Sequence, residues 1–455
     1  EIALAIEAAK QHNIQPVLGI RAKLNCSGNN RWGNSTGDRA KFGLTAVEIM
    51  QAINQLKAAD MLDALQLLHF HIGSQISAIA KIKEALNEAG QIYINLCQLG
   101  ANMRYIDVGG GLGIDYDGSQ TNSPASKNYS MQNYANDVVA EIQAACNSQQ
   151  LASPIIVSES GRAIASHQSV LLLKVLGIDE VEDCKNHPQT NGYHPIVKEI
   201  SDIYNTLDST NCQELYNDLL QAKKNIEQLF SLGYLTLQER AAAESLFWGC
   251  CKQIQRLNKN QGSISDELRK LDEVLTSVYY CNFSVFQSMP DSWAIDQLFP
   301  IMPIHRLREK PTELGILADL TCDSDGKIDQ FIGQKRSRPY LELHKWNQKQ
   351  PYYLGVFLGG AYQEIMGSLH NLFGDTNAVH VRLEEDGYHI EHVVRGDSIA
   401  KVLSYVQYHS QNMVESLRQE TERALKEKRI TLQESLRFLK HYEDSLLNYT
   451  YLAED

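Results

Sequence analysis

The stretch Asp107-Val-Gly-Gly-Gly-Leu-Gly-Ile-Asp-Tyr-Asp-Gly118 decides how the first part of this chain folds. Its glycines follow an apolar, β-rich run at 103–108, so they begin where a predicted strand ends. Glycines placed there let backbone N–H groups approach an anion, and the N-terminus of a following helix adds a favourable dipole. The pattern differs from a Rossmann fingerprint, because Ile114 stands where the third glycine belongs, and from a Walker loop, which needs Gly-Lys-Ser/Thr. The alternative interpretation is a tight turn between a strand and a helix.

Strands and helices alternate regularly around this stretch. The apolar, β-rich runs that predict strands are 17–24, 65–72, 103–108 and 154–157. The segments that predict helices are 45–57, which a capping box of Thr45 and Glu48 opens, 79–99 and 131–146. This alternation predicts a parallel sheet, and polar residues follow each strand, as they do at the C-terminal rim of a (β/α)8 barrel. About four βα units precede Asp179, so we expect half of a barrel with an exposed apolar strand edge.

The rest of the chain changes its pattern twice. Apolar residues at helical spacing predict four helices between 195 and 280, which we interpret as an inserted bundle. Strand-like runs with turn signals follow, and then helices return, the last with Leu432 and Leu436 facing inward. The expected fold class is α/β plus β. Its parts are a partial (β/α)8 barrel at 1–194, a helical bundle at 195–280, a C-terminal β domain at 281–397 and a terminal helical extension at 398–455.

Composition argues against several classes of protein. The net charge of −13 repels phosphate backbones, so nucleic acid is not an expected partner. No apolar run approaches the roughly 20 residues that a membrane helix needs, so no membrane partner is expected either. Nine cysteines, an odd number without a CxxC pair, argue against a disulfide framework or a zinc site. We therefore expect a globular protein of the reducing cytoplasm.

Reactive side chains gather where the predicted strands end. Glu159 and Arg162 follow one strand, and they either serve different parts of one ligand or form a surface ion pair. His71 and Ser74 follow another strand, next to a small-residue turn suited to phosphate. Cys322 begins the segment Cys-Asp-Ser-Asp-Gly, which does not match a calcium loop because its glycine comes two positions early. The simpler interpretation of that segment is a turn with an incidental cysteine.

Together these motifs resemble the fold-III pyridoxal-phosphate decarboxylases, and most closely the biosynthetic arginine decarboxylases. The segments that match occur in the family's order: Leu68-His-Phe-His-Ile-Gly-Ser-Gln75, Asp107–Gly118, Ser158-Glu-Ser-Gly-Arg162, Thr321-Cys-Asp-Ser-Asp-Gly326, and also Lys41–Leu44 and Gly360–Tyr362. The similarity runs through almost the whole chain. It includes the helical insert, which resembles the arginine branch rather than the ornithine or diaminopimelate decarboxylases. The resemblance implies a (β/α)8 barrel that binds pyridoxal 5'-phosphate, followed by a β domain.

The resemblance assigns roles residue by residue. His71 is similar to the histidine that stacks on the cofactor ring, and Glu159 to the acid that faces the pyridine nitrogen. The groups that resemble the family's phosphate cradle are Ser74, Gly109, Gly110, Gly111, Arg162 and Tyr362. Cys322 and Asp323 resemble a Cys-Asp pair that one protomer delivers into the site of another. A homo-oligomer with shared active sites is therefore implied.

The implied reaction is decarboxylation of L-arginine to agmatine and CO2 in polyamine biosynthesis. A carboxylate such as Glu159 favours protonation of the pyridine nitrogen, and Cys322 is a candidate proton donor to the alpha carbon. Asp323 is the first candidate to hold the guanidinium of arginine, with Asp291 and Asp296 as weaker ones, because guanidinium pairs well with carboxylates. The resemblance also implies Mg2+, for which no motif here gives independent support.

One feature of the family is missing. Its cofactor lysine lies in a short motif, Tyr-x-x-Lys-x-Asn, near the start of the barrel, and nothing here matches; Lys23 and Lys174 lie in predicted strands without that context. We expect that the chain lacks the N-terminal part of the barrel and is inactive alone. The alternatives are a related diaminopimelate or ornithine decarboxylase, and a non-catalytic homologue that binds a partner protomer. Cys322, Glu159 and Arg162 argue against the last, since a binding remnant has no chemical need for all three.

Overall fold

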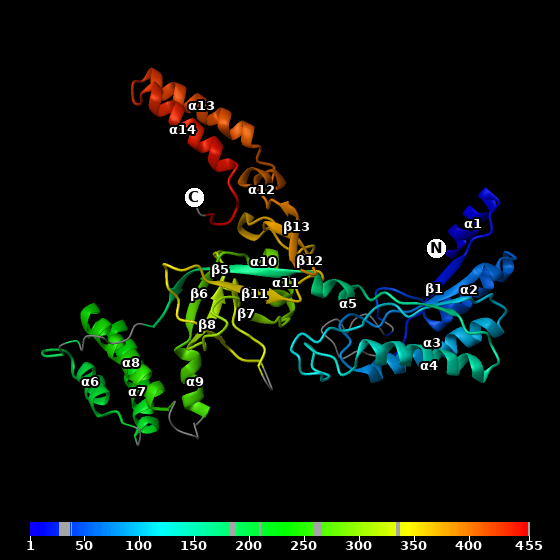
Figure 1. The fold of residues 1–455 in the computed structure, drawn as a ribbon, viewed down its shortest axis with the longest axis horizontal. Helices are drawn as coiled ribbons and strands as arrows, with labels where there is room; N and C mark the ends of the chain where they lie inside the picture. Colours follow the sequence, from blue (N-terminus) through cyan, green and yellow to red (C-terminus); the bar gives the residue numbers. More distant parts are fainter. Residues whose placement is uncertain are drawn as a thin grey trace.

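Two separate sheets organise the chain. The computed structural model describes residues 1–26, 37, 39–181, 188, 190–208, 211–258, 266–333 and 337–453. Figure 1 shows an elongated molecule with a parallel sheet and its helices at one end and a second sheet in the middle. A helical bundle lies at the other end, and a pair of long helices projects from the middle.

Four short strands form the first sheet in the order β1-β2-β3-β4, and each neighbouring pair is parallel. The strands are β1 (Leu18–Arg21), β2 (Leu65–His69), β3 (Tyr105–Asp107) and β4 (Ile155–Val157). The helices that alternate with them are α1 (Ile2–His12), α2 (Ala46–Ala58), α3 (Ile79–Gln98) and α4 (Met131–Ser148), with the short helix η2 (Leu62–Ala64) before β2. Thr45 and Glu48 form the predicted capping box at the start of α2, each side chain accepting from the other's backbone N–H.

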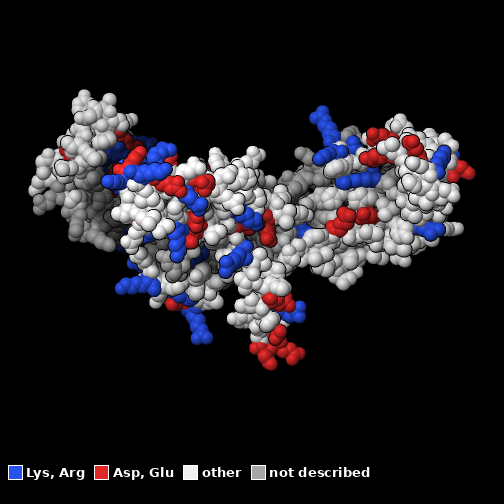
Figure 2. Space-filling model, turned by 90° about the horizontal axis from the view of Figure 1, so that it is seen from above, with Lys and Arg blue, Asp and Glu red and all other residues white. Residues whose placement is uncertain are grey.

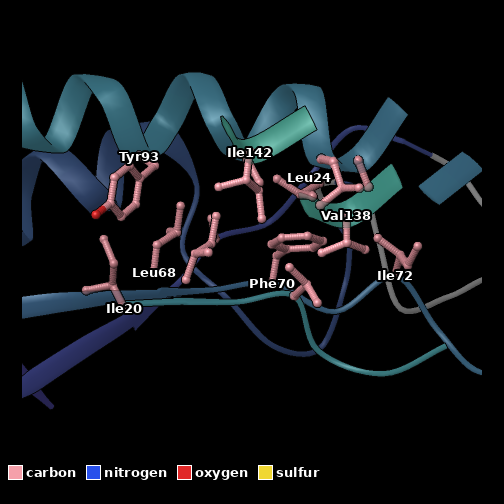
Figure 3. Close-up of a cluster of buried hydrophobic side chains, with 14 of the residues drawn as sticks. Ile20, Leu24, Leu68, Phe70, Ile72, Tyr93, Val138 and Ile142 are labelled. Atoms are coloured by element: carbon pink, nitrogen blue, oxygen red, sulfur yellow. The ribbon is translucent and has the colours of Figure 1, made fainter. Parts of the chain in front are cut away.

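The first hydrophobic core lies between this sheet and its helices. Figure 3 shows Val138 and Ile142, four residues apart on one face of α4, packed over Leu68 and Phe70. Tyr93 of α3 completes the layer in the same view. Leu68 is fully buried and Phe70 almost so, which fixes the end of β2 and hence the loop that follows it.

The predicted partial barrel is confirmed. Among the described residues, β1 and β4 form the two edges of the parallel sheet, which has half the strands of a (β/α)8 barrel. On β4 the side chain of Ile155 is 61% exposed and that of Val157 is 39% exposed. Apolar side chains therefore line an open strand edge, as the count of βα units predicted.

The second sheet is mixed, and its strand order is β10-β8-β6-β5-β11-β7, with β9 beside β8. Its strands are β5 (Val170–Asp179), β6 (Ser277–Cys281), β7 (Ile301–Pro303), β8 (Glu313–Ala318), β9 (Lys327–Ile328), β10 (Leu341–Leu343) and β11 (Tyr353–Phe357). We expected residues up to 194 to belong to the barrel part, but β5 pairs with β6 and β11. The alternating residues Leu173 and Val175 are buried in the core of this second sheet. The change of sheet therefore falls at α5 (Gly161–Ala165) and the short helix η3 (Ser166–Gln168) that follows it.

The predicted inserted bundle is confirmed and enters between two paired strands. Its helices are α6 (Pro195–Thr206), α7 (Cys212–Ser231), α8 (Leu237–Asn258) and α9 (Asp266–Val274). Because β5 and β6 are antiparallel neighbours, the bundle is an enlarged connection within one hairpin. It has its own core, in which Val197, Leu219, Leu246 and Ile254 are fully buried.

The C-terminal part carries two apolar surfaces that the single chain leaves exposed. It contains α10 (Val285–Ser288), α11 (Pro290–Ile295), η4 (His370–Leu372), the hairpin β12 (Ala378–Glu384) and β13 (Gly387–Val394), and α12 (Ile399–Tyr405), α13 (Ser410–Lys426) and α14 (Leu432–Leu446). The pairs Val379–Val393, Val381–Ile390 and Leu383–Tyr388 share one face of the hairpin, and all six residues are exposed. On α14 the expectation of an inward face is wrong for Leu432 and Leu436, which are 64% and 61% exposed, because no described element packs over that face.

Surface charge and helix composition bear on the expected partners. Figure 2 shows Lys and Arg interspersed with Asp and Glu over the face it presents. None of the described helices combines the length and the apolar composition that crossing a membrane requires.

We expect Leu68→Ala to lower the free energy of unfolding of the parallel-sheet lobe by ~2–5 kcal/mol, because it leaves a cavity in a fully buried site. Leu4→Ala is the matched control, since Leu4 is 68% exposed on α1 and its truncation should change stability by less than ~0.5 kcal/mol. Hydrogen exchange of α3 and α4 peptides in urea reports this lobe separately from the others. Equal losses in the two variants would contradict the packing described.

Candidate active site

The glycine loop after β3 is packed too closely for any side chain. A Cβ on Gly109 would collide with the carbonyl oxygen of Phe70, and φ at Gly109 is +64°. A Cβ on Gly110 would lie 2.6 Å from the carbonyl oxygen of Glu159. At Gly111, with φ at +114°, it would lie 2.9 Å from a side-chain carbon of Ile76. The loop is therefore wedged between the segments that follow β2 and β4.

Two of the N–H groups that we expected to approach an anion are used within the chain. The Gly109 N–H donates to Asp107 Oδ1 at 2.8 Å, and the Gly110 N–H donates to His71 Nδ1 at 3.0 Å. The contribution of these glycines to a ligand site is therefore mainly room for the backbone and for the ligand. Asp107 also lies 2.9 Å from His69 Nδ1 through its other oxygen, so it links the ends of β2 and β3.

His71 lies at the centre of this rim as a neutral imidazole. Burial lowers its pKa, and the nearby cation Arg21 and the neighbouring His69 act in the same direction. Because Nδ1 accepts from Gly110, the ring proton is placed on Nε2. The ring is thus held in one orientation by a backbone donor.

Arg162 gathers polar groups from several loops around a buried cation. The residue is 5% exposed, its Nε donates to Ser74 Oγ at 3.1 Å, and its Nη1 donates to the Tyr116 hydroxyl at 2.9 Å. Its Cζ lies 4.8 Å from the ring centroid of Tyr362. The Tyr116 and Ser166 hydroxyls are 3.4 Å apart. A cation with hydroxyls on one side and an aromatic ring on another is suited to an anionic group such as phosphate.

Tyr362 reaches this cluster because glycine precedes it by two positions. A Cβ on Gly360 would collide with the carbonyl oxygen of Ala165 at the end of α5. The Gly360 N–H donates to the carbonyl oxygen of Ser166 at 3.1 Å. Tyr362 itself has a left-handed backbone, with φ at +70°. This close approach brings the segment after β11 against the helix that carries Arg162.

Glu159 is an exposed carboxylate at the same rim. Its backbone N–H donates to the Gly109 carbonyl at 2.8 Å, which fixes its position at the end of β4. Burial lowers the pKa of Arg21 at the end of β1, while the charges of Glu159 and Asp107 oppose this shift. Glu159 therefore shares the rim with a cation from β1, the strand at the opposite edge of the sheet.

Cys322 and Asp323 lie on a tight turn after β8. The Cys322 N–H donates to Asn371 Oδ1 at 2.9 Å, and Asp323 Oδ2 lies 3.6 Å from His370 Nε2. The thiol of Cys322 is exposed. These contacts tie the turn to the segment 370–371, which follows Tyr362 in the chain.

The two other acidic candidates differ in how available they are. Asp291 is 6% exposed, and its carboxylate accepts from Gln363 Nε2 at 2.8 Å while its backbone N–H donates to Gln363 Oε1 at 3.1 Å. This double contact ties α11 to the residue after Tyr362 and favours a positioning role. Asp296 ends α11 in a left-handed conformation, with φ at +51°, and is exposed.

Sequence reasoning missed Tyr116, Arg21, His370 and Asn371. Tyr116 lies inside the quoted Asp107–Gly118 motif, and its phenol could have been noticed as a polar group beside the glycines. Arg21 carries the signal of a charged residue at the C-terminal end of a barrel strand. His370 and Asn371 give no such signal, because only the fold brings them to Cys322.

The described residues fit a phosphorylated aromatic cofactor better than a metal ion. The Arg162 cluster provides a buried cation and hydroxyls for phosphate, and the oriented ring of His71 lies on the same rim. Among the residues that the structure describes, no group of three or more His, Cys, Asp or Glu side chains could hold a metal ion.

Three family models match this chain. Residues 2–166 match the pyridoxal binding domain of pyridoxal-dependent decarboxylases. Residues 190–272 match the arginine decarboxylase helical bundle domain, and residues 399–452 match the arginine decarboxylase C-terminal helical extension. Each model therefore falls on one of the parts described above.

Whole proteins and solved structures agree with these models. The biosynthetic arginine decarboxylase of Thermosynechococcus vestitus is 60% identical over all of this chain, which spans 71% of that protein. That of Nostoc is 59% identical over 99% of this chain, which spans 67% of it. The crystal structure of the biosynthetic arginine decarboxylase SpeA from Campylobacter jejuni superposes with a TM-score of 0.84 at 34% identity, covering all of this chain and 72% of its own.

A more distant likeness concerns the fold alone. Diaminopimelate decarboxylase from Helicobacter pylori has a TM-score of 0.52 at 16% identity, covering 89% of this chain and 71% of its own. With relatives at about 60% identity that this chain matches from end to end, the family is shown. The chain belongs to the biosynthetic arginine decarboxylases, a family of pyridoxal-dependent enzymes.

Proposed function

We propose that this chain decarboxylates L-arginine to agmatine and CO2 with pyridoxal 5'-phosphate as its cofactor. The observation that carries the proposal is the buried guanidinium of Arg162, which donates to Ser74 and Tyr116 beneath the ring of Tyr362. The cluster follows the C-terminal ends of parallel strands, where barrel enzymes bind their ligands. Its cation and hydroxyls match a phosphate group in charge and in hydrogen bonding.

The residues around the cofactor would each have a distinct task. Arg162, Ser74 and Tyr362 would hold the phosphate, with Gly109, Gly110 and Gly111 leaving room beside it. The cofactor, when bound, supplies an electron sink for the pair that remains as CO2 departs. Glu159 would keep a proton on the pyridine nitrogen, which makes that sink effective. His71, neutral and oriented by Gly110, would lie against the ring without adding a charge.

The substrate end of the site is proposed to come from the turn after β8. Cys322 has an exposed thiol and would deliver a proton to the carbon that loses CO2. Asp323 would hold the guanidinium of arginine through charge-assisted hydrogen bonds. From the family resemblance we propose that Cys322 and Asp323 act in the site of a second copy. The protein would then be a homo-oligomer with shared sites.

Three further points remain predictions from the family resemblance. Agmatine made here would feed polyamine synthesis, Mg2+ would be required, and the cytoplasm would be the location. Lys23 and Lys174 were considered for the role of the cofactor lysine. Lys174 lies on β5 in the second sheet. Lys23 follows β1, and its backbone N–H donates to the carbonyl oxygen of Leu44. We propose that neither residue holds the cofactor.

We expect these 455 residues alone to form agmatine from arginine at well below an enzymatic rate. The parallel sheet described has open edges, so water reaches the rim where the chemistry would occur. The comparison is the same chain joined to the part of the Thermosynechococcus relative that lies outside the matched residues. Agmatine formation should rise sharply in the joined protein. Equal turnover by the two would place the cofactor lysine within the present chain and contradict this proposal.

We expect Arg162→Gln to weaken binding of pyridoxal phosphate about 10- to 100-fold, since a hydrogen bond to a charged group is worth ~1.5–3 kcal/mol. Binding of pyridoxal, which has no phosphate, should change little. Arg104→Gln is the control, because Arg104 is exposed before β3. Should Arg162→Gln fold poorly, Ser74→Ala removes one hydroxyl and keeps the cation. An equal loss for both ligands would mean that Arg162 supports the fold and not the phosphate.

A mixture of two impaired variants tests the shared site. If Cys322 acts in the partner's site, a dimer of one Arg162→Gln and one Cys322→Ala protomer retains one intact site of its two. The experiment uses the form of the protein that turns over arginine. Random mixing makes about half of the dimers mixed, so the activity should reach about a quarter of the wild-type value. At a cofactor concentration that saturates only the wild-type site, each variant mixed with itself should keep only its own low activity. Failure of the mixture to gain activity, with mixed dimers demonstrated by mass, would place Cys322 in the site of its own chain.

A further inference from the structure

The segment that follows Tyr362 meets the Cys322 turn in an unusual backbone conformation. Asn371 has φ at +54° and Leu372 has φ at +58°, both in the left-handed region. Asparagine tolerates this region because its short polar side chain bonds locally, whereas leucine pays a steric cost there. Such a conformation persists only where the surrounding structure holds it. Here the Asn371 side chain is turned toward the turn after β8.

Asn371 and Asp319 hold the turn from two sides. Asn371 Oδ1 accepts the backbone N–H of Cys322 at 2.9 Å. Asp319, 5% exposed, accepts from the N–H and the hydroxyl of Thr321 at 2.8 and 2.7 Å and from the Val285 N–H at 2.9 Å. A Cβ on Gly326 would collide with the Asp319 carboxylate. The thiol of Cys322 therefore projects from a turn whose backbone is fixed at both ends.

His370 faces the carboxylate that follows Cys322. Its Nε2 lies 3.6 Å from Asp323 Oδ2, is shielded from solvent and makes no hydrogen bond within the part of the chain that the structure describes. A shift of less than 1 Å would bring the two atoms into hydrogen-bond range. The imidazole rests on the ring of Phe286 from α10, with ring centroids 4.5 Å apart.

The charged groups around His370 are few and mostly acidic. Asp323 lies at 3.6 Å, and the charge of His370 in turn acts on buried Asp319. The neighbouring α10 presents the apolar ring of Phe286. From α12, which also packs on this segment, Lys401 is paired with Asp397, which lies just before that helix. The neighbours of His370 therefore include two carboxylates, those of Asp323 and Asp319.

We propose that Asn371 and His370 are positioning residues for the Cys322–Asp323 turn, in which Asn371 holds the Cys322 backbone and His370 holds the Asp323 carboxylate. This inference rests on the proposed function and deepens it at the same site. An imidazole N–H that reaches Asp323 Oδ2 would fix the direction of the carboxylate that receives the guanidinium of arginine.

The split between KM and kcat separates this role from a purely structural one. In the form that turns over arginine, we expect His370→Ala to raise KM for arginine about 2- to 5-fold with kcat little changed, the size expected for a partly exposed pair. His370→Gln keeps a side chain that can donate to Asp323 and should return KM toward the wild-type value. His380→Ala is the matched control, because His380 is exposed on β12. Equal KM in wild type and His370→Ala would overturn the proposal.

A second set of variants tests Asn371 without relying on turnover. Asn371→Gly accepts the left-handed backbone but removes the acceptor for the Cys322 N–H, whereas Asn371→Asp keeps both. Hydrogen exchange of the 321–326 peptide in the 455-residue chain should speed up in Asn371→Gly and return toward wild type in Asn371→Asp. Unchanged exchange in Asn371→Gly would overturn the clamp even if the enzyme is active. Faster exchange in a chain that never decarboxylates arginine would support the clamp and count against the proposed function alone.

Discussion

The guanidinium of Arg162 is the charge around which the two sheets meet. Burying a charged group costs several kcal/mol unless polar partners surround it. Nearby loops supply such partners for Arg162. Ser74 follows β2, Tyr116 follows β3 and Tyr362 follows β11 of the second sheet. The cation therefore fixes the position of the second sheet relative to the barrel strands.

The segment from Gly360 to Asn371 transmits this constraint to the other end of the site. Gly360 packs against the end of α5, and Gly367 packs against the backbone of Gln287 so closely that neither tolerates a Cβ. Between them, Gln363 is joined to buried Asp291. The same segment ends at Asn371, which accepts from Cys322. One stretch of chain thus touches both the proposed phosphate end and the proposed proton donor.

Most elements could be predicted because each depends on local pattern. The capping box at Thr45, the glycines after β3 and the helical spacing of the insert all act within a few residues of chain. Which segments pack or pair with one another is not decided by local sequence, and the predictions were incomplete on this point. An apolar run such as Val170–Asp179 indicates a strand but cannot say that its neighbours are β6 and β11. Likewise Leu432 and Leu436 mark one apolar face of α14 without saying what covers it.

The candidate site likewise has features that could be predicted from the sequence and features that could not. Residue types at strand ends, such as Glu159 and Arg162, were visible because position along the strand determines which end of the sheet they occupy. The use of the Gly109 and Gly110 N–H groups was not visible, since it depends on where the side chains of Asp107 and His71 lie.

The acidic candidates show why geometry must decide among equal residue types. Asp291 is buried and already accepts from Gln363, so a guanidinium would have to displace that amide. Asp323 accepts the Asp325 backbone N–H through Oδ1 at 2.9 Å, and its Oδ2 lies 3.6 Å from His370 Nε2. Asp296 is exposed at the end of α11, where water screens its charge more strongly than that of buried Asp291. A guanidinium that entered this region would therefore not have to displace a side-chain amide at Asp323, as it would at Asp291.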